Sequence, residues 1–216
     1  FQNTGSMLSY KRNFPKAGHE LTADVTYNKS KNNSSNLIKT DSLDYSTKNI
    51  VKTSSQRQDG SGTNENFIFQ TDYTNPLTDK SKFEMGARVS IRKVDNKNDF
   101  FLISPSGTAI YNPLSSVNYN STDKVYAAYS TYTNQIKNFG YQLGLRIESS
   151  NYEGRLPDKG QVFNIKFPVS LFPSIFLSNK MKNDQELQLN YTRKINRPNF
   201  FQLYPFTDYA DSLNIN

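Results

Sequence analysis

The sequence predicts an all-β protein of the antiparallel, up-and-down transmembrane β-barrel class. Three observations predict it: short connections alternate with long ones, a two-residue hydrophobic rhythm flanks every short connection, and aromatic residues cluster beside the short turns. A sheet whose two ends face different compartments typically shows this asymmetry of connection length. The short turns lie near Pro15–His19, Pro76–Ser81, Gln135–Asn138 and Lys180–Gln185, and the long polar stretches are Asn28–Gly62, Asn96–Thr122 and Glu153–Gln161.

Four strands are predicted in the N-terminal half from alternating apolar and polar side chains. In the first, Leu8 and Tyr10 alternate with Ser9 and Lys11. Successive side chains of a strand point to opposite faces of a sheet, so one face is apolar and the other polar. The same rhythm predicts the next three strands, at Leu21–Tyr27, Phe67–Tyr73 and Phe83–Ile91.

The fifth strand, Lys124–Asn134, is ambiguous in its facing. Val125, Ala127 and Tyr129 form one candidate apolar set, and Tyr126, Ala128 and Tyr132 form the other. Both facings therefore stay open at the level of the sequence.

Three further strands bring the expected number to about eight. The sixth, Phe139–Glu148, alternates clearly, and the eighth covers Glu186–Ile195. The seventh is the weakest, because Pro168 and Pro173 have no N–H to donate to a ladder. We expect Pro173 at a bulge or at the outer rim of its strand.

Alternation fits two environments for the apolar face. A soluble sandwich buries that face against a second sheet, whereas a membrane barrel turns it to lipid around a wet lumen. Strands of ten or more residues favour the barrel, since globular strands usually run about 5–6 residues. So does the charge on the polar face, which is carried by Asp24, Glu84, Arg88, Arg92, Arg146 and Glu148.

Two alternatives remain open beside a section of a large barrel. The first is a soluble, secreted β-sandwich that binds glycans or a protein partner. The second is a self-contained eight-stranded barrel with enzymatic or adhesive loops, in which strand eight would pair back onto strand one.

Composition limits the function classes. The 216 residues carry a formal charge of +7 and no cysteine, which excludes disulfides and thiolate metal sites. Lysine and arginine are scattered without a compact basic stripe, so we expect no nucleic-acid binding. No run approaches the ~18 apolar residues that a membrane-spanning helix needs.

Catalytic and metal-binding patterns are weak. The one histidine, His19, falls in a predicted turn, where we expect a solvated side chain without the partners of a catalytic triad. The segment Asp95–Asp99 faintly resembles a calcium loop but has Phe100 where such a loop needs glycine. We therefore expect no enzymatic activity, no metal site and no cofactor.

Several segments, in order, resemble the outer-membrane β-barrel domain of TonB-dependent receptor-like proteins. The resemblance spans nearly the whole chain, and its most specific part is Ile195–Pro198 with the aromatic sequel Gln202–Phe206. The other matching segments are Gly18–Asp24, Tyr126–Tyr129, Phe139–Glu148, Leu171–Ser174 and Leu187–Arg193.

The resemblance implies a barrel of about 22 strands with a plugged lumen. Residues 1–216 would then be part of that barrel domain, and the plug domain and the remaining strands would lie outside this sequence. Such receptors bind a nutrient ligand at the surface of a Gram-negative cell and import it through the outer membrane. The implied partners are outer-membrane lipid, the protein's own plug and a TonB-type energy transducer.

Candidate ligand-binding residues follow from this reading. Charged side chains on the polar face, Arg88, Arg92 and Arg146, would line the lumen; we favour a salt-bridged wall against a plug over a ligand site, since buried charges need partners. Loops of such barrels usually make the ligand contacts. The loop candidates are Arg197, Phe200, Phe201 and Tyr204. For the three aromatic residues, packing onto the barrel rim is the favoured alternative.

Overall fold

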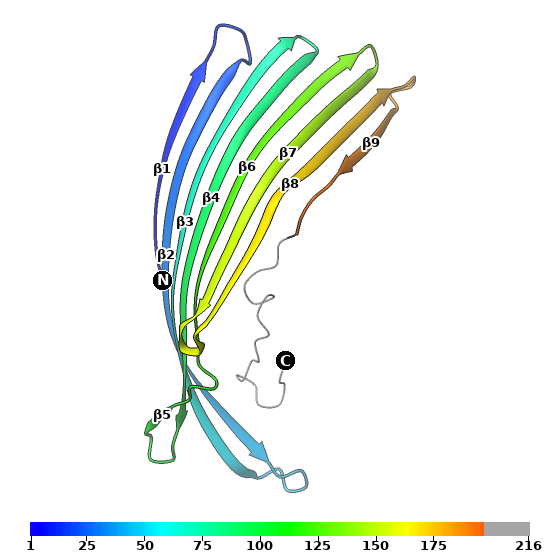
Figure 1. The fold of residues 1–216 in the computed structure, drawn as a ribbon. Helices are drawn as coiled ribbons and strands as arrows, with labels where there is room; N and C mark the ends of the chain where they lie inside the picture. The colour runs from blue at the N-terminus through cyan, green and yellow to red at the C-terminus, as the bar shows by residue number, and fades with distance from the viewer. Residues whose placement is uncertain (197–216) are drawn as a thin grey trace.

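The computed structural model describes residues 1–196, which form one antiparallel sheet of nine strands (Figure 1). Along the sheet the order is β1-β2-β3-β4-β6-β7-β8-β9, and the short β5 pairs with β4. Among these residues no helix is long and apolar enough to cross a membrane. The elements are β1 Gln2–Asn13, β2 Glu20–Leu43, β3 Ile50–Thr78, β4 Ser81–Ile103, β5 Ala109–Tyr111, β6 Val117–Ile136, β7 Phe139–Leu156, η1 Pro157–Lys159, β8 Gln161–Lys180 and β9 Glu186–Thr192.

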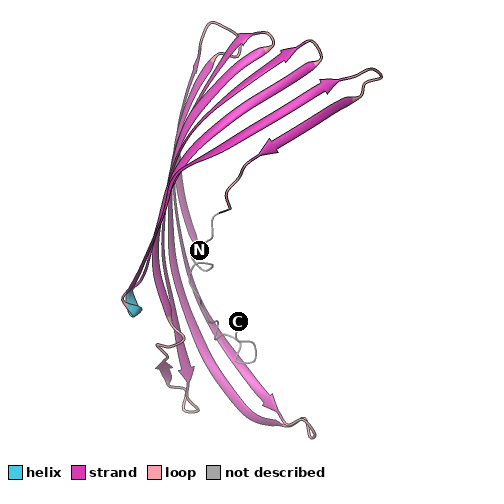
Figure 2. Ribbon diagram, turned by 45° about the vertical axis from the view of Figure 1, so that its right-hand side comes forward, coloured by secondary structure: helices cyan, strands magenta, loops and turns pink. Residues whose placement is uncertain are grey.

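Eight of the nine strands follow one another across the sheet in sequence order, each antiparallel to the next, which confirms the predicted up-and-down, all-β class. Strands curve along their length and fan apart toward the short turns (Figures 1 and 2). No second sheet covers either face within residues 1–196, so the sandwich alternative is wrong for this part of the chain. Nor do β1 and β9 pair with each other there, so the described strands do not close a small barrel.

The three long polar stretches are mostly strand, and the expectation that they are loops is wrong. β2 and β3 continue through Asn28–Gly62 and leave residues 44–49 as their connection. β4 and β6 likewise extend into Asn96–Thr122, and β7 and β8 into Glu153–Gln161. Polar side chains on both faces hid these extensions, because a two-residue rhythm marks a strand only where one face is apolar.

These extensions make the strands far longer than a bilayer requires. β3 has 29 residues, whereas about 9–11 tilted residues cross the hydrocarbon. The sheet therefore continues well beyond the membrane on the side of the long connections, which is the extracellular side in barrels of this type.

In the half of the sheet near the short turns, the register gathers most apolar side chains of the main strands on one face. Residues directly opposite each other in an antiparallel pair lie on the same face, and Val25, Phe69 and Val89 form one such row. We call this set the apolar belt. Its members are Leu8, Tyr10, Leu21, Val25, Tyr27, Phe67, Phe69, Tyr73, Phe83, Met85, Val89, Ile91, Tyr126, Tyr132, Phe139, Tyr141, Leu143, Leu145, Ile147, Leu171, Ile175, Leu177, Leu187, Leu189 and Tyr191.

Belt side chains remain open to the surroundings. Leu143 is 46% exposed, Leu145 41% and Leu189 65%. A continuous apolar surface of this size is costly in water. Facing hydrocarbon it is stabilising, and this is the arrangement that the prediction required.

The belt crosses the ladder diagonally. On β2 it ends at Tyr27, which lies in the row of Phe67 and Ile91. On β7 it ends earlier, at Ile147, which lies in the row of Ala128 and Ala87. A diagonal belt is what tilted strands produce when the membrane plane is level, since barrel strands tilt by about 35–45°.

The register also settles the facing of β6. Tyr126 pairs with Val89, and Tyr132 pairs with Phe83 and Leu143, so Tyr126, Ala128 and Tyr132 are the outward set. Val125, Ala127 and Tyr129 lie on the polar face.

Both prolines of β8 occupy positions where a missing N–H is tolerated. The pairing of β7 with β8 shifts between Glu148 and Ser150, which leaves Pro168 and Val169 opposite a single residue in a β-bulge. Pro173 lies one residue beyond the last β8–β9 rung, Ser174–Thr192, and its carbonyl accepts from the Arg193 N–H at 3.1 Å. The bulge is thus at Pro168, and Pro173 marks the end of the β8–β9 ladder.

We expect adjacent substitutions on β6 to differ sharply in cost. Ser130 lies in the belt between Met85 and Leu145, whereas Thr131 lies on the polar face beside Glu84. S130R should reduce the free energy of unfolding in lipid vesicles by about 2–4 kcal/mol, because it places a cation near the bilayer midplane.

The matched variant T131R should cost less than about 1 kcal/mol, since its cation lies beside a carboxylate on the wet face. Urea titration monitored by tyrosine fluorescence measures both. Equal costs for the two variants would contradict the assignment of the faces.

Candidate functional site on the polar face

A connected set of polar side chains covers the face opposite the belt on β3 and β4. Arg88 Nη1 donates to Gln70 Oε1 at 3.2 Å, and Gln70 Nε2 donates to Asp72 Oδ2 at 2.9 Å. Gln70 therefore links the arginine to the carboxylate, because its amide offers both an acceptor and a donor. The guanidinium keeps further N–H groups for another partner.

The second arginine of this face is held within its own strand. Arg146 donates from Nε and Nη2 to Glu148 Oε2 at 2.9 and 2.7 Å. Glu148 is 5% exposed, whereas the arginine side chain is 37% exposed. Ala127 lies between Glu148 and Arg88 in the same row. The two charged residues therefore flank a small side chain on the polar face.

Arg92 continues the set toward the extracellular side. Its Nε lies 3.6 Å from Asp123 Oδ2 on the neighbouring β6. We call Gln70, Asp72, Arg88, Arg92, Asp123, Arg146 and Glu148 the polar wall. It brings together the three candidate arginines of the polar face, each beside an acceptor. The loop candidates Arg197, Phe200, Phe201 and Tyr204 lie outside the described residues.

Above the polar wall, the same face becomes apolar. Val117, Tyr119 and Leu156 are buried, with 8%, 6% and 1% exposure, and Val94 and Phe163 pack against them. Tyr119 Oη accepts a hydrogen bond from Asn96 Nδ2 at 3.2 Å, so the ring is fixed as well as buried. We call these five residues the upper apolar patch.

The sequence reasoning missed this patch because it treated its segments as loops. The alternation of Phe163, Ile165 and Phe167 with Asn164 and Lys166 was the signal that could have revealed it. The bulge at Pro168 shifts the alternation by one position. Odd-numbered residues of β8 lie on the polar face before the bulge and on the belt face after it.

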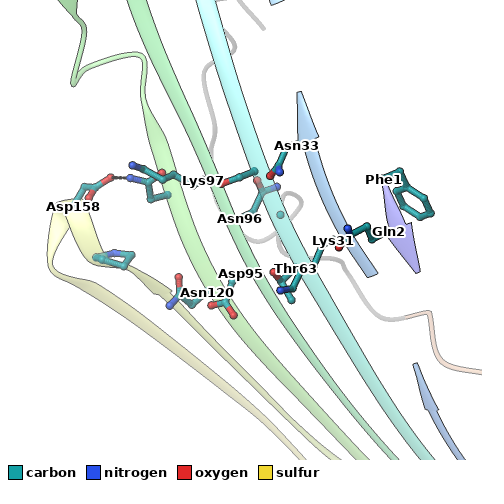
Figure 3. A pocket seen from close by; sticks show the side chains of 14 residues that line it. Phe1, Gln2, Lys31, Asn33, Thr63, Asp95, Asn96, Lys97, Asn120 and Asp158 are labelled. Atoms are coloured by element: carbon teal, nitrogen blue, oxygen red, sulfur yellow. Dashed lines mark hydrogen bonds between the residues drawn. The ribbon is translucent and has the colours of Figure 1, made fainter. Parts of the chain in front are cut away.

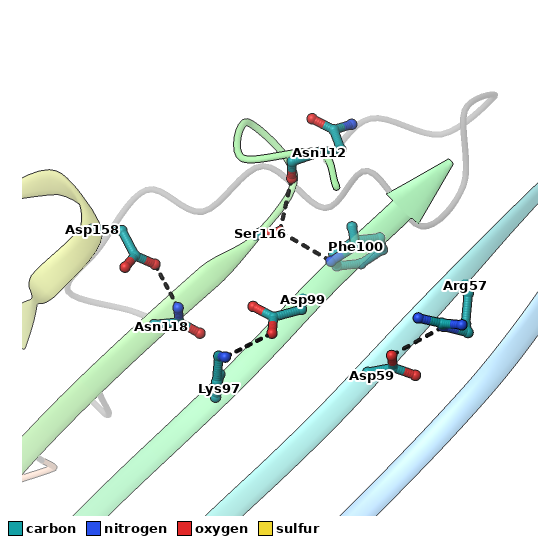
Figure 4. Close-up of polar contacts among 9 residues, drawn as sticks. All are labelled: Arg57, Asp59, Lys97, Asp99, Phe100, Asn112, Ser116, Asn118 and Asp158. Carbon is teal, nitrogen blue, oxygen red and sulfur yellow. Dashed lines mark hydrogen bonds and ion pairs between the residues drawn. The ribbon is translucent and has the colours of Figure 1, made fainter. Parts of the chain in front are cut away.

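Beyond the membrane, the opposite face carries charged pairs in place of the belt. Arg57 Nε lies 3.0 Å from Asp59 Oδ2, and Lys97 Nζ lies 2.9 Å from Asp99 Oδ2 (Figure 4). Asn118 Nδ2 donates to Asp158 Oδ2 of η1 at 2.6 Å. The two faces thus exchange polarity where the strands leave the hydrocarbon. The outer face, which contacts lipid at membrane depth, contacts water beyond it and carries charged side chains there.

Side chains also order the extracellular connections. Ser116 Oγ donates to the Asn112 carbonyl at 2.7 Å and accepts from the Phe100 N–H at 3.0 Å, which fixes the connection before β6 (Figure 4). Asp44 accepts from the Thr47 N–H and hydroxyl at 2.7 and 2.9 Å. These hydrogen bonds hold the pKa of the Asp44 carboxyl below its usual value.

His19 is more than a solvated turn residue, and that expectation needs correction. Its ring stacks on Phe14 with the centroids 4.1 Å apart, and its Nε2 lies 2.9 Å from Tyr73 Oη. The histidine therefore joins the first short turn to β3. Among residues 1–196, no three histidine, aspartate or glutamate side chains are placed to hold a metal ion together.

We expect the Arg146–Glu148 pair to stabilise the wall more than an exposed pair does. R146Q should lower the free energy of unfolding by about 1–3 kcal/mol, because it removes two charge-assisted hydrogen bonds from a buried carboxylate. The matched variant is R155Q, since Arg155 pairs with Glu153 at 2.9 Å with its side chain 62% exposed.

R155Q should cost about 0–1 kcal/mol, as exposed pairs do. Urea unfolding of both variants in the same vesicles makes the comparison. A larger loss in R155Q than in R146Q would overturn the structural role given to the buried pair.

Comparison with known proteins agrees with the geometry. The sequence model of the outer membrane protein beta-barrel family matches residues 12–216. None of the curated proteins matches the chain. Among solved structures, the crystal structure of the ferric citrate transporter FecA in its unliganded form is similar, with a TM-score of 0.58 and 12% sequence identity.

The similarity to this transporter covers 87% of the present chain and 26% of the transporter, and at this identity it shows the fold alone. The chain thus corresponds to about a quarter of that barrel protein's length. The outer-membrane barrel that the sequence resembled is confirmed, and with it the Gram-negative outer membrane as its location. Its strands, its belt and the matched residues together show that this chain belongs to the outer membrane protein beta-barrel family.

Proposed function

We propose that this chain is a wall section of a TonB-dependent receptor-like barrel that binds a nutrient at the cell surface and imports it. The polar wall is the observation that carries the proposal. Its arginines and carboxylates lie on the face away from lipid, where an empty wide lumen would be an open channel. A plug domain resting on this wall supplies polar partners and keeps the channel closed.

The open edges of the sheet support a larger barrel. In hydrocarbon every backbone N–H and C=O needs a partner, and β1 and β9 each leave one edge unpaired among residues 1–196. Closure therefore needs strands beyond those described. A barrel of about 22 strands has a lumen wide enough to hold a plug.

We assign different roles to the two parts of the lumen face. The polar wall, at membrane depth, contacts the plug through Arg88 and Arg146. The upper apolar patch lies toward the outside, where a ligand arrives first, and the packing of its buried side chains fixes the strands at the mouth of the barrel. The function is binding and transport, with no catalytic step assigned to this chain.

The outer-membrane partners follow from this scheme. Lipid surrounds the belt, the plug fills the lumen, and a TonB-type transducer of the inner membrane acts on the plug. The imported ligand belongs to the class of scarce nutrients that need active uptake, because a plugged barrel gives no passive route to a large solute.

We expect deletion of the complete gene to impair growth on one limiting nutrient. The test supplies iron complexes, cobalamin or oligosaccharides singly as the limiting source and compares deletion, complemented and transducer-deficient strains. The deletion should abolish growth on one source, the transducer-deficient strain should show the same defect, and the complete gene should restore growth.

A folded, surface-exposed protein whose loss affects growth on none of these sources would contradict import and favour adhesion. A growth defect that persists only in the receptor deletion, with the transducer-deficient strain growing normally, would contradict energised transport. Heat-modifiable migration in gels verifies that the complemented protein is folded in both cases.

A further inference from the structure

A row of lysines follows the extracellular margin of the apolar belt. On β2 and β4, Lys29 and Lys93 are the next residues on the belt face after Tyr27 and Ile91. On β6, Lys124 is the next residue on that face beyond Tyr126.

The fourth lysine continues this row on β8. Lys166 pairs with Asn151, which in turn pairs with Lys124, so all three lie in one row of the same face. We call Lys29, Lys93, Lys124 and Lys166 the border lysines.

The border lysines track the slope of the belt. Lys29 and Lys93 occupy one row, linked through Glu65. Lys124 and Lys166 lie one row nearer the short turns, and the belt itself descends in the same direction. Since the belt marks the hydrocarbon, the four ammonium groups lie at one membrane level, where the headgroups of the outer leaflet begin.

Of the acidic side chains on this face, Asp95 lies one row beyond the lysines, and the two at their level are engaged in ion pairs. Glu65 forms an ion pair with Lys29, and Glu153 forms one with Arg155 at 2.9 Å. Glu65 also interacts electrostatically with Lys93 across the β3–β4 ladder, so one carboxylate serves two of the four lysines and the row keeps a positive excess. Cations immediately outside a hydrocarbon surface recognise anionic lipid headgroups.

A polar depression of about 580 Å³ lies directly beyond this row on the same face. Figure 3 shows the side chains that line it. Its lining comes from several neighbouring strands and includes Lys31, Asn33, Thr63, Asp95, Asn118 and Asn120. Amides, hydroxyls and a carboxylate offer both donors and acceptors, which is the set that sugar hydroxyl groups require.

An apolar depression of about 460 Å³ lies on the belt below the row. Its lining includes the small side chains of Thr71, Ala87, Ala128 and Ser130 and the larger ones of Met85 and Leu145. Ala87 is six residues from Lys93 on β4, which is about 20 Å at the strand rise and spans the hydrocarbon of one leaflet, about 15 Å.

We propose that this surface binds a phosphorylated glycolipid of the outer leaflet. Its acyl chain lies in the apolar depression, its phosphate groups contact the border lysines, and its sugar unit occupies the polar depression. The three features share one face and follow one another in the order that such a lipid requires. This proposal rests on the outer-membrane location and is independent of whether the barrel imports a nutrient.

The test uses the full-length protein in mild detergent and counts bound lipids by native mass spectrometry. The probes are a bis-phosphorylated glucosamine glycolipid, its dephosphorylated counterpart and phosphatidylcholine. The variant K93Q/K124Q/K166Q leaves the Lys29–Glu65 pair intact. The control K80Q/K180Q/K182Q removes the same charge from the short turns at the other end of the strands.

The wild type and the control should bind the phosphorylated glycolipid with equal affinity and prefer it to both other probes. K93Q/K124Q/K166Q should lose about tenfold or more in affinity, because each lysine near the headgroups contributes to phosphate binding. The variant K93R/K124R/K166R should retain binding, and heat-modifiable migration should show that all variants are folded.

Equal losses in K93Q/K124Q/K166Q and in the control would overturn the proposal, since charge alone would then explain the effect. So would equal affinity for the phosphorylated and dephosphorylated lipids. Displacement of the lipid by millimolar inorganic phosphate would show a small-anion site in place of a glycolipid site. None of these outcomes depends on growth, so failure here is separable from failure of the import function.

Discussion

The structure depends on one constraint: inside hydrocarbon, each backbone N–H and C=O must find a partner within the protein. Antiparallel pairing from β1 to β9 meets this demand for every interior strand, and the short turns keep neighbours in register. Once pairing is continuous, the register determines which side chains face lipid and which face the lumen. A slip of one residue would bring Arg88 or Arg146 to the lipid and leave Leu145 in the lumen.

The same hydrogen-bonded ladder passes from lipid into water, and the side chains on its two faces differ between these environments. At membrane depth the belt faces lipid and the polar wall faces the lumen. Beyond it, ion pairs such as Lys97–Asp99 replace the belt, while Val117, Tyr119 and Leu156 gather on the other face. Strand length is therefore not set by membrane thickness. The hydrogen-bonded ladder continues outward beyond the hydrocarbon, and this outer half of the sheet carries the surface connections.

The arginines of the lumen face have hydrogen-bond acceptors or carboxylates within the sheet itself. Arg146 is held by Glu148, Arg92 lies beside Asp123, and Arg88 reaches Gln70. A wall with its own acceptors stays ordered when a plug moves, because its charges are not left without partners. In the proposed receptor, the N–H groups of Arg88 and Arg146 that these pairs do not use would contact the plug. The outer surface follows the same logic, with belt, lysines and polar depression ordered as water replaces hydrocarbon.

The sequence by itself determined the strand class, the short turns, the apolar face and the three arginines of the wall, because a period of two with one apolar face is a local property. It could not determine the facing of Lys124–Asn134, the strand extensions through Asn28–Gly62 or the upper apolar patch. Those depend on which residues become partners across strands: Tyr126 faces lipid because Val89 lies opposite it, and Phe163 faces inward because a bulge at Pro168 shifts the phase. Pairing between distant segments sets register, and only the tertiary structure contains it.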